Sequence, residues 1–188
     1  MTHRSSPGRW VILAFALAAG QAVCAARAVE AQATITVGST SGTPGALVAF
    51  AVTLQTTGTD LPALQADISF DGVNTPIRVN ASGGPDCTAS STLTGLGATV
   101  SFAFLPNACT GSACNTVRAI VMNMDPHVSI PTGSTLYTCN VQIASAAAVG
   151  IYPLDVSGVV AVAGSGIRLE ASGVDGQVTV SAPGGGGC

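Results

Sequence analysis

Large apolar and polar residues alternate along two short stretches of the chain, residues 47–55 and 64–71. A period of two is typical of a β-strand that buries one face and exposes the other. The residues expected to point inward are Val48, Phe50, Val52 and Leu54 in the first stretch, and Leu64, Ala66, Ile68 and Phe70 in the second. Both stretches are therefore predicted to be half-buried strands.

Seven further strands are expected from similar apolar runs bounded by turn residues. They are Ala33–Gly38, Pro76–Ala81, Thr99–Leu105, Val117–Met124, Leu136–Ala144, Ile151–Val162 and Gly176–Ser181. No segment has a convincing helical period, and Ala144–Val149 is expected to form at most a short turn. About nine strands without intervening helices predict an all-β chain, a single jelly-roll or Greek-key β-sandwich.

Residues 1–33 have the layout of a secretory signal peptide, with two early arginines, an apolar run over 11–19 and small residues up to Ala33. Cleavage is expected after Ala25 or after Ala33, and we favour Ala33. The apolar run is too short to span a bilayer, so no transmembrane segment is expected after signal removal. The remaining chain divides into a domain at 34–181 and a Gly-rich tail at 182–188 ending in Cys188. We expect a bacterial protein that is secreted or held at the cell surface.

Charge and composition exclude several classes of function. Lysine is absent, and residues 34–188 contain three arginines against eight carboxylates, a net charge of −5. Such a surface offers nothing to nucleic acids or anionic membranes. The same segment has one histidine, His127, and no nucleophile motif or metal-ligand spacing to accompany it. The sequence therefore predicts a protein without catalytic activity, metal or cofactor.

One strand carries a possible contact surface. Because Arg118 is not expected to be buried without a partner, its parity places Ile120 and Met122 outward as well. Exposed Ile and Met side chains rimmed by polar groups are typical of a partner-binding patch. The alternative is a bulge that turns Ile120 or Met122 inward, or a loop that covers them.

Several short motifs resemble a cohesin domain, and together they cover Thr34–Ser181. They are Ile35–Ser39, the turn Gly42–Gly45 leading into Val48–Leu54, the strand end Ile68–Asp71, the segment Ala144–Tyr152 and the closing strand Asp175–Val180. The resemblance implies a nine-stranded jelly roll related to carbohydrate-binding modules, without catalysis, that docks the dockerin module of a partner protein. The four domain cysteines and the lack of lysine depart from the family's usual pattern, so the usual partner specificity does not carry over.

The resemblance also implies which residues are neighbours. In the cohesin arrangement the strand at 117–124 shares a sheet with residues 64–71. The hypothesis for the partner-binding site is therefore Gln65, Asp67, Ser69, Arg118, Ile120 and Met122. The same topology makes a Cys87–Cys139 disulfide plausible, whereas Cys109 and Cys114 are expected to pair because they flank a hairpin tip.

Two other functions remain open at this stage. A carbohydrate-binding module of the same architecture would bind an extracellular polysaccharide, but polysaccharide platforms expose several aromatic rings. The only tryptophan, Trp10, lies in the signal peptide, and four phenylalanines are assigned to the core: Phe50, Phe70, Phe102 and Phe104. Tyr137 and Tyr152 remain, and alternation favours core packing for them too. The third possibility is a structural or adhesive surface domain.

Overall fold

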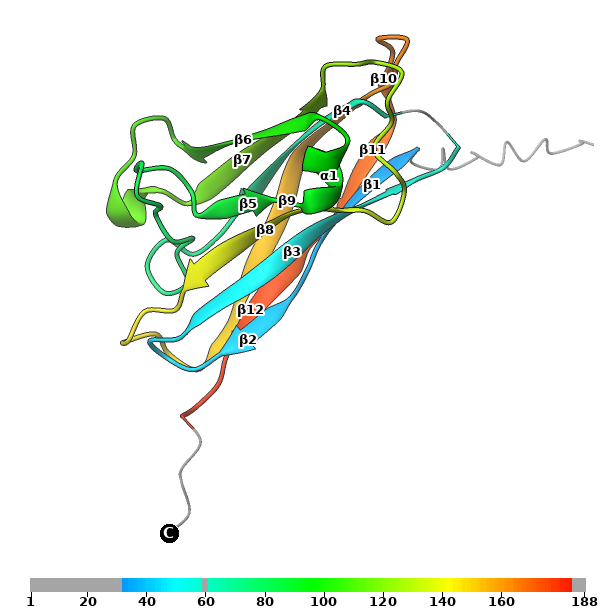
Figure 1. Ribbon diagram of the computed structural model, residues 1–188. Helices are drawn as coiled ribbons and strands as arrows, with labels where there is room; N and C mark the ends of the chain where they lie inside the picture. Colours follow the sequence, from blue (N-terminus) through cyan, green and yellow to red (C-terminus); the bar gives the residue numbers. More distant parts are fainter. Residues whose placement is uncertain (1–31, 59–60, 184–188) are drawn as a thin grey trace, which may run out of the picture.

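A computed structural model describes residues 32–58 and 61–183 (Figure 1). Most of the predicted signal peptide and most of the Gly-rich tail lie outside the described residues. Two β-sheets lie face to face with the core between them, which confirms the predicted all-β sandwich. The described residues include no helix with the length and hydropathy needed to cross a bilayer.

The five-stranded sheet has the order β11-β1-β3-β8-β5. Its strands are β1 (Ala33–Val37), β3 (Leu47–Thr56), β5 (Cys87–Ala89), β8 (Thr135–Gln142) and β11 (Ala171–Val174). The seven-stranded sheet has the order β2-β12-β9-β4-β7-β6, with β10 paired to β9. Its strands are β2 (Thr40–Gly42), β4 (Ala63–Ser69), β6 (Ala98–Leu105), β7 (Thr116–Asn123), β9 (Gly150–Val162), β10 (Arg168–Leu169) and β12 (Gly176–Val180).

Eight of the nine expected strands are present, and one is wrong. Residues 76–81 make only isolated bridges, between Ile77 and Val141 and between Val79 and Pro85. Pro76 has no N–H for a ladder hydrogen bond, and the backbone turns back at Gly83, whose φ is 85°. Asn80 stabilises this turn by accepting hydrogen bonds from the N–H groups of Ser82 and Gly84.

The structure also contains short elements that the sequence pattern did not predict. Four strands of two to four residues, β2, β5, β10 and β11, are too short to show alternation. A five-residue helix, α1 (Ser91–Gly95), is capped at its N-terminus by Ser90, whose hydroxyl accepts from Leu93 N–H at 3.3 Å. The only other helix in the described part of the chain is the 3₁₀ turn η1 (Gly111–Ala113). One turn of helix is too short to produce a helical period.

The inward faces of both sheets form one core, with the predicted alternation in β3 and β4. Phe50, Ile68 and Phe70 are buried as expected. Tyr137 is 1% exposed and packs edge-on against Phe102, with ring centroids 5.1 Å apart. Burial, and secondarily the charge of Asp67, raises the pKa of the Tyr137 phenol. Core packing thus holds for Tyr137.

One disulfide joins two strands of the five-stranded sheet, and the other lies in a connection of the seven-stranded sheet. Cys87 on β5 is bonded to Cys139, its cross-strand neighbour on β8. Cys109 is bonded to Cys114 in the connection between β6 and β7. Cys109–Cys114 is the pair expected from the hairpin, and Cys87–Cys139 is the pair that the cohesin resemblance implied; disulfides fit an exported protein.

Ala33 bears on the two candidate cleavage sites. It is the first residue of β1, is buried, and its N–H donates to the carbonyl of Glu170. Cleavage after Ala33 would remove this residue from the sheet, whereas cleavage after Ala25 would leave β1 intact.

Candidate functional site

The outward face of β7 presents the apolar side chains that parity placed there. Ile120 is 39% exposed and Met122 is 42% exposed, while Val117, Ala119 and Val121 point into the core. Pairing of β7 with β4 on one side and β6 on the other runs without a register shift, so no bulge turns these side chains inward. Their side chains are open to solvent rather than covered by a loop.

The neighbouring strands widen this apolar surface. Gln65 of β4 lies opposite Ile120 on one side and Val160 of β9 on the other, and Ala63 lies likewise between Met122 and Val162. A shallow depression of about 160 Å³ lies among these strands. It is lined by Ala63, Leu64, Gln65, Ile120, Val160 and Val162. We define the apolar patch as Ala63, Ile120, Met122, Val160 and Val162.

Sequence reasoning missed Val160 and Val162 because β9 contains a bulge. Gln65 pairs with Val160 but Asp67 pairs with Ser157, so β9 has one extra residue at this point. Gly158 lies in the bulge with a φ of 58°, a conformation that glycine adopts without a Cβ penalty. The extra residue reverses the inward and outward parity beyond it. Gly158 within an apolar run was the one signal that could have indicated the bulge.

An ion pair borders the apolar patch. Arg118 donates from Nε and an Nη atom to the two carboxylate oxygens of Asp67, its cross-strand neighbour, at 2.7 and 2.6 Å. The hydrogen bonds and the charge of Asp67 raise the pKa of Arg118. Arg118 thus points outward, as its parity predicted, and its charge is neutralised by a bidentate ion pair with Asp67. One row further along, the hydroxyls of Ser69 and Thr116 lie 3.3 Å apart.

All six residues of the sequence hypothesis therefore lie on one face of β4 and β7. Five of them lie in three cross-strand pairs: Gln65 with Ile120, Asp67 with Arg118, and Ser69 with Thr116, which is outside the set. The face is apolar at the end near Met122 and polar at the end near Ser69.

The polar end is acidic. Ser69, Phe70, Asp71, Pro153 and Asp155 line a second depression of about 270 Å³. Asp71 is committed to the turn after β4, where it accepts from the N–H groups of Val73 and Asn74 and from the Asn74 amide. Desolvation opposes ionisation, but the hydrogen bonds from Asn74 and Val73 outweigh it and lower the pKa of Asp71.

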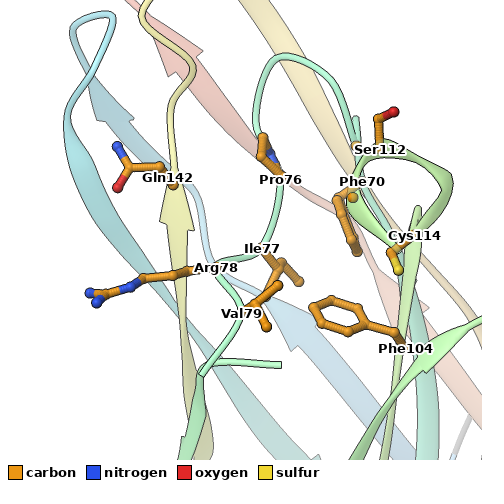
Figure 2. Close-up of a pocket in the computed structure, with 11 residues that line it drawn as sticks. Phe70, Pro76, Ile77, Arg78, Val79, Phe104, Ser112, Cys114 and Gln142 are labelled. Carbon is orange, nitrogen blue, oxygen red and sulfur yellow. The ribbon is translucent and has the colours of Figure 1, made fainter. Parts of the chain in front are cut away.

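A separate apolar cavity of about 330 Å³ lies at one end of the sandwich, where Phe70, Ile77, Val79 and Phe104 converge (Figure 2). Arg78 and Gln142 also border it, but Figure 2 shows both side chains directed away from the converging apolar groups. The segment around η1, including the disulfide-bonded Cys114, forms another wall of this cavity. The lining offers no acid, histidine or free thiol for catalysis. In the described residues no three His, Cys, Asp or Glu side chains gather where a metal ion could bind.

No protein-family model matches the chain, and no curated protein sequence matches it either. Solved structures do. A type I cohesin of Clostridium thermocellum, solved in a cohesin–dockerin complex, superposes with a TM-score of 0.65 at 12% identity, covering 80% of this chain and 99% of that one. The chain has the cohesin fold.

Two other cohesins show how widely this fold extends at low identity. A cohesin of Clostridium acetobutylicum, determined in solution, gives a TM-score of 0.61 at 20% identity over 80% of this chain and 92% of that one. A non-cellulosomal cohesin from the archaeon Archaeoglobus fulgidus gives a TM-score of 0.60 at 12% identity, covering 81% of this chain and 93% of that one. The cohesin resemblance in the sequence motifs is therefore confirmed at the level of the fold.

Proposed function

We propose that this chain is an exported, non-catalytic module that binds a dockerin-like protein through the outward face of β4, β7 and β9. The observation that carries the proposal is the apolar patch, in which Ile120 and Met122 are exposed and the other three residues partly exposed, on a sheet whose core-facing side is already filled. The cohesin fold, seen elsewhere in cohesin–dockerin complexes, supports a protein partner.

The chemistry of the face suits a protein surface. Ile120, Met122 and the two valines would lose water on contact, and methionine adapts its shape to a partner. In the neighbouring ion pair the Arg118 side chain is 39% exposed and the Asp67 side chain 13% exposed, so the pair would contribute orientation more than affinity. We infer that the apolar patch supplies the binding energy and that Gln65, Asp67, Ser69 and Arg118 form its polar border.

The described residues offer little support for an enzyme. His127 is exposed in a loop, where its backbone N–H donates to the Asp125 carboxylate at 2.9 Å, and no serine or cysteine of the described residues is hydrogen-bonded to its ring. We therefore propose a binding role without catalysis, and a location outside the cell or at its surface, consistent with two disulfides.

The test is capture of a partner by the exported chain from the secreted and surface proteins of the producing organism. The captured protein is then identified, and its isolated dockerin-like module is titrated by calorimetry. Met122→Arg should abolish binding of both the protein and the module, while circular dichroism and the melting temperature stay unchanged. Ile151→Arg is the matched control, because Ile151 is 65% exposed on the same sheet but outside the apolar patch. Equal binding by both variants would refute the proposed face.

A carbohydrate-binding role has less support. Tyr137 is buried, and the hydroxyl of partly buried Tyr152 donates to the carbonyl of Ala148 at 2.8 Å. A flat row of exposed rings is not found among the described aromatic residues. Saturable binding of a polysaccharide that Tyr152→Ala removes, together with no protein partner, would nevertheless favour this function over ours.

A further inference from the structure

The four outermost strands of the two sheets differ sharply in length. Strands β2, β5 and β11 have three, three and four residues, whereas β6 has eight. An outermost strand exposes a row of unpaired N–H and C=O groups, and proteins usually protect such rows by keeping the strand short. Strand β6 is the exception, and it lies at one edge of the seven-stranded sheet in Figure 1.

The other usual protections are also missing from β6. Its eight residues include no charged side chain and no proline, and its pairing with β7 has no bulge. The whole stretch from Cys87 to Val117 contains no charged residue. In the described part of the chain, the backbone of residues 98–104 makes no hydrogen bond beyond its pairing with β7. This edge is therefore open to an added strand.

The side chains of β6 suit a second strand of the same kind. Val100, Phe102 and Phe104 face the core but are only partly buried, because no strand lies beyond them in the sheet. Thr99, Ser101 and Ala103 face outward and are exposed. An added strand would need apolar residues on the inner side and small uncharged residues on the outer side.

We propose that β6 pairs antiparallel with β6 of a second copy of this chain, related to the first by a two-fold axis. Both partners would then have the same length and the same pattern, and neither would bring a charge to the contact. Keeping inward residues on one face allows Phe102 to lie opposite Phe102, with Val100 opposite Phe104. Aromatic pairs and pairs of aromatic with β-branched residues are favourable cross-strand neighbours.

This pairing would extend the seven-stranded sheet into the second copy without covering the apolar patch. The two β7 strands would be three strand spacings apart, about 14 Å. With a two-fold axis perpendicular to the sheet, both patches would face the same side. The dimer does not depend on the proposed function, but it would present two binding faces side by side.

The test is sedimentation equilibrium of the exported chain carrying Cys188→Ser, so that a bond between terminal thiols cannot join the copies. We expect a dimer that dissociates on dilution. Ser101→Lys with Ala103→Lys places lysines opposite each other in the proposed register and should weaken the dimer roughly tenfold or more. Val149→Lys with Ile151→Lys, at two exposed positions far from β6 in the sheet order, is the matched control and should dimerise like the parent.

A charge exchange separates pairing from damage to the fold. Ser101→Asp with Ala103→Asp should weaken the dimer to a similar extent when alone, and a mixture of the Lys and Asp variants should form a heterodimer. A parent chain that stays monomeric at all concentrations would overturn the proposal. A Lys variant that dimerises like the parent would overturn it as well, and so would a mixture that forms no heterodimer.

Discussion

The two sheets have similar inward faces but different outward faces. The outward side chains of β1 and β8 in the five-stranded sheet are mainly polar and make bonds within the chain. Thr34 bonds Ser172 at 3.1 Å, Asn140 donates to Asp86 at 3.0 Å, and Gln142 donates to the carbonyl of Gly45 at 3.0 Å. The apolar patch on the seven-stranded sheet makes no comparable contacts. Only the inward faces are needed to form the sandwich, so the apolar patch is not required by the fold, which supports the binding role that we propose for it.

Removing the disulfides should give the largest difference in stability between the two sheets. Cys87 and Cys139 are 52 residues apart, whereas Cys109 and Cys114 are five apart. In the chain-entropy model a longer closed loop stabilises more. Cys87→Ala with Cys139→Ala should lower the free energy of unfolding by about 4 kcal/mol, and Cys109→Ala with Cys114→Ala by about 2 kcal/mol. Urea unfolding of both variants measures this; equal losses would show that loop length does not govern the effect.

Substituting two isoleucines of the seven-stranded sheet, one buried and one exposed, should affect stability and partner binding differently. Ile68 on β4 is fully buried, and Ile68→Ala should cost about 2–5 kcal/mol of stability. Ile120→Ala on β7 should cost less than about 0.5 kcal/mol, because the side chain is partly exposed. The same Ile120→Ala change should weaken partner binding about tenfold or more, as at an interface hot spot. A large loss of stability in the Ile120 variant would assign the residue to the fold instead.

The sequence was most informative where alternation runs undisturbed. Strands β3, β4 and β7 keep a period of two along their whole length, so their buried faces and the outward position of Ile120 followed from parity. In β9 a single parity does not hold along the strand, because the Gly158 bulge reverses it and brings Val160 and Val162 onto the outward face. The pattern of one strand does not indicate where its neighbour places an extra residue.

Elements that depend on contacts between residues distant in sequence could not be predicted from the alternation of apolar and polar residues either. Strand β11 is four residues long and forms by parallel pairing with β1, about 140 positions earlier in the chain. The Asp67–Arg118 ion pair required knowing the register of β4 and β7, which the alternation of either strand alone does not fix. The outward parity of Arg118 was predictable, but its partner was not.

The smallest expected effect on stability comes from Asp71, at the acidic end of the seven-stranded sheet. Its pKa is lowered from the ordinary value of 3.8 by hydrogen bonds from Asn74 and Val73, acting against desolvation. A carboxylate with a lowered folded-state pKa stabilises the protein above its unfolded pKa and loses that contribution as the pH falls through the folded value. Asp71→Asn should therefore cost about 1 kcal/mol near neutral pH, the typical contribution of a hydrogen bond.

The difference between the parent and Asp71→Asn should shrink as the pH falls below 3.8 and vanish once the parent carboxyl is protonated. Urea unfolding at a series of pH values measures the difference. Val73→Ala, at an exposed position of the same turn that carries no ionisable group, serves as a control whose effect should not change over this acidic range. A cost for Asp71→Asn that persists unchanged in strong acid would mean that the turn depends on the shape of the side chain and not on its charge.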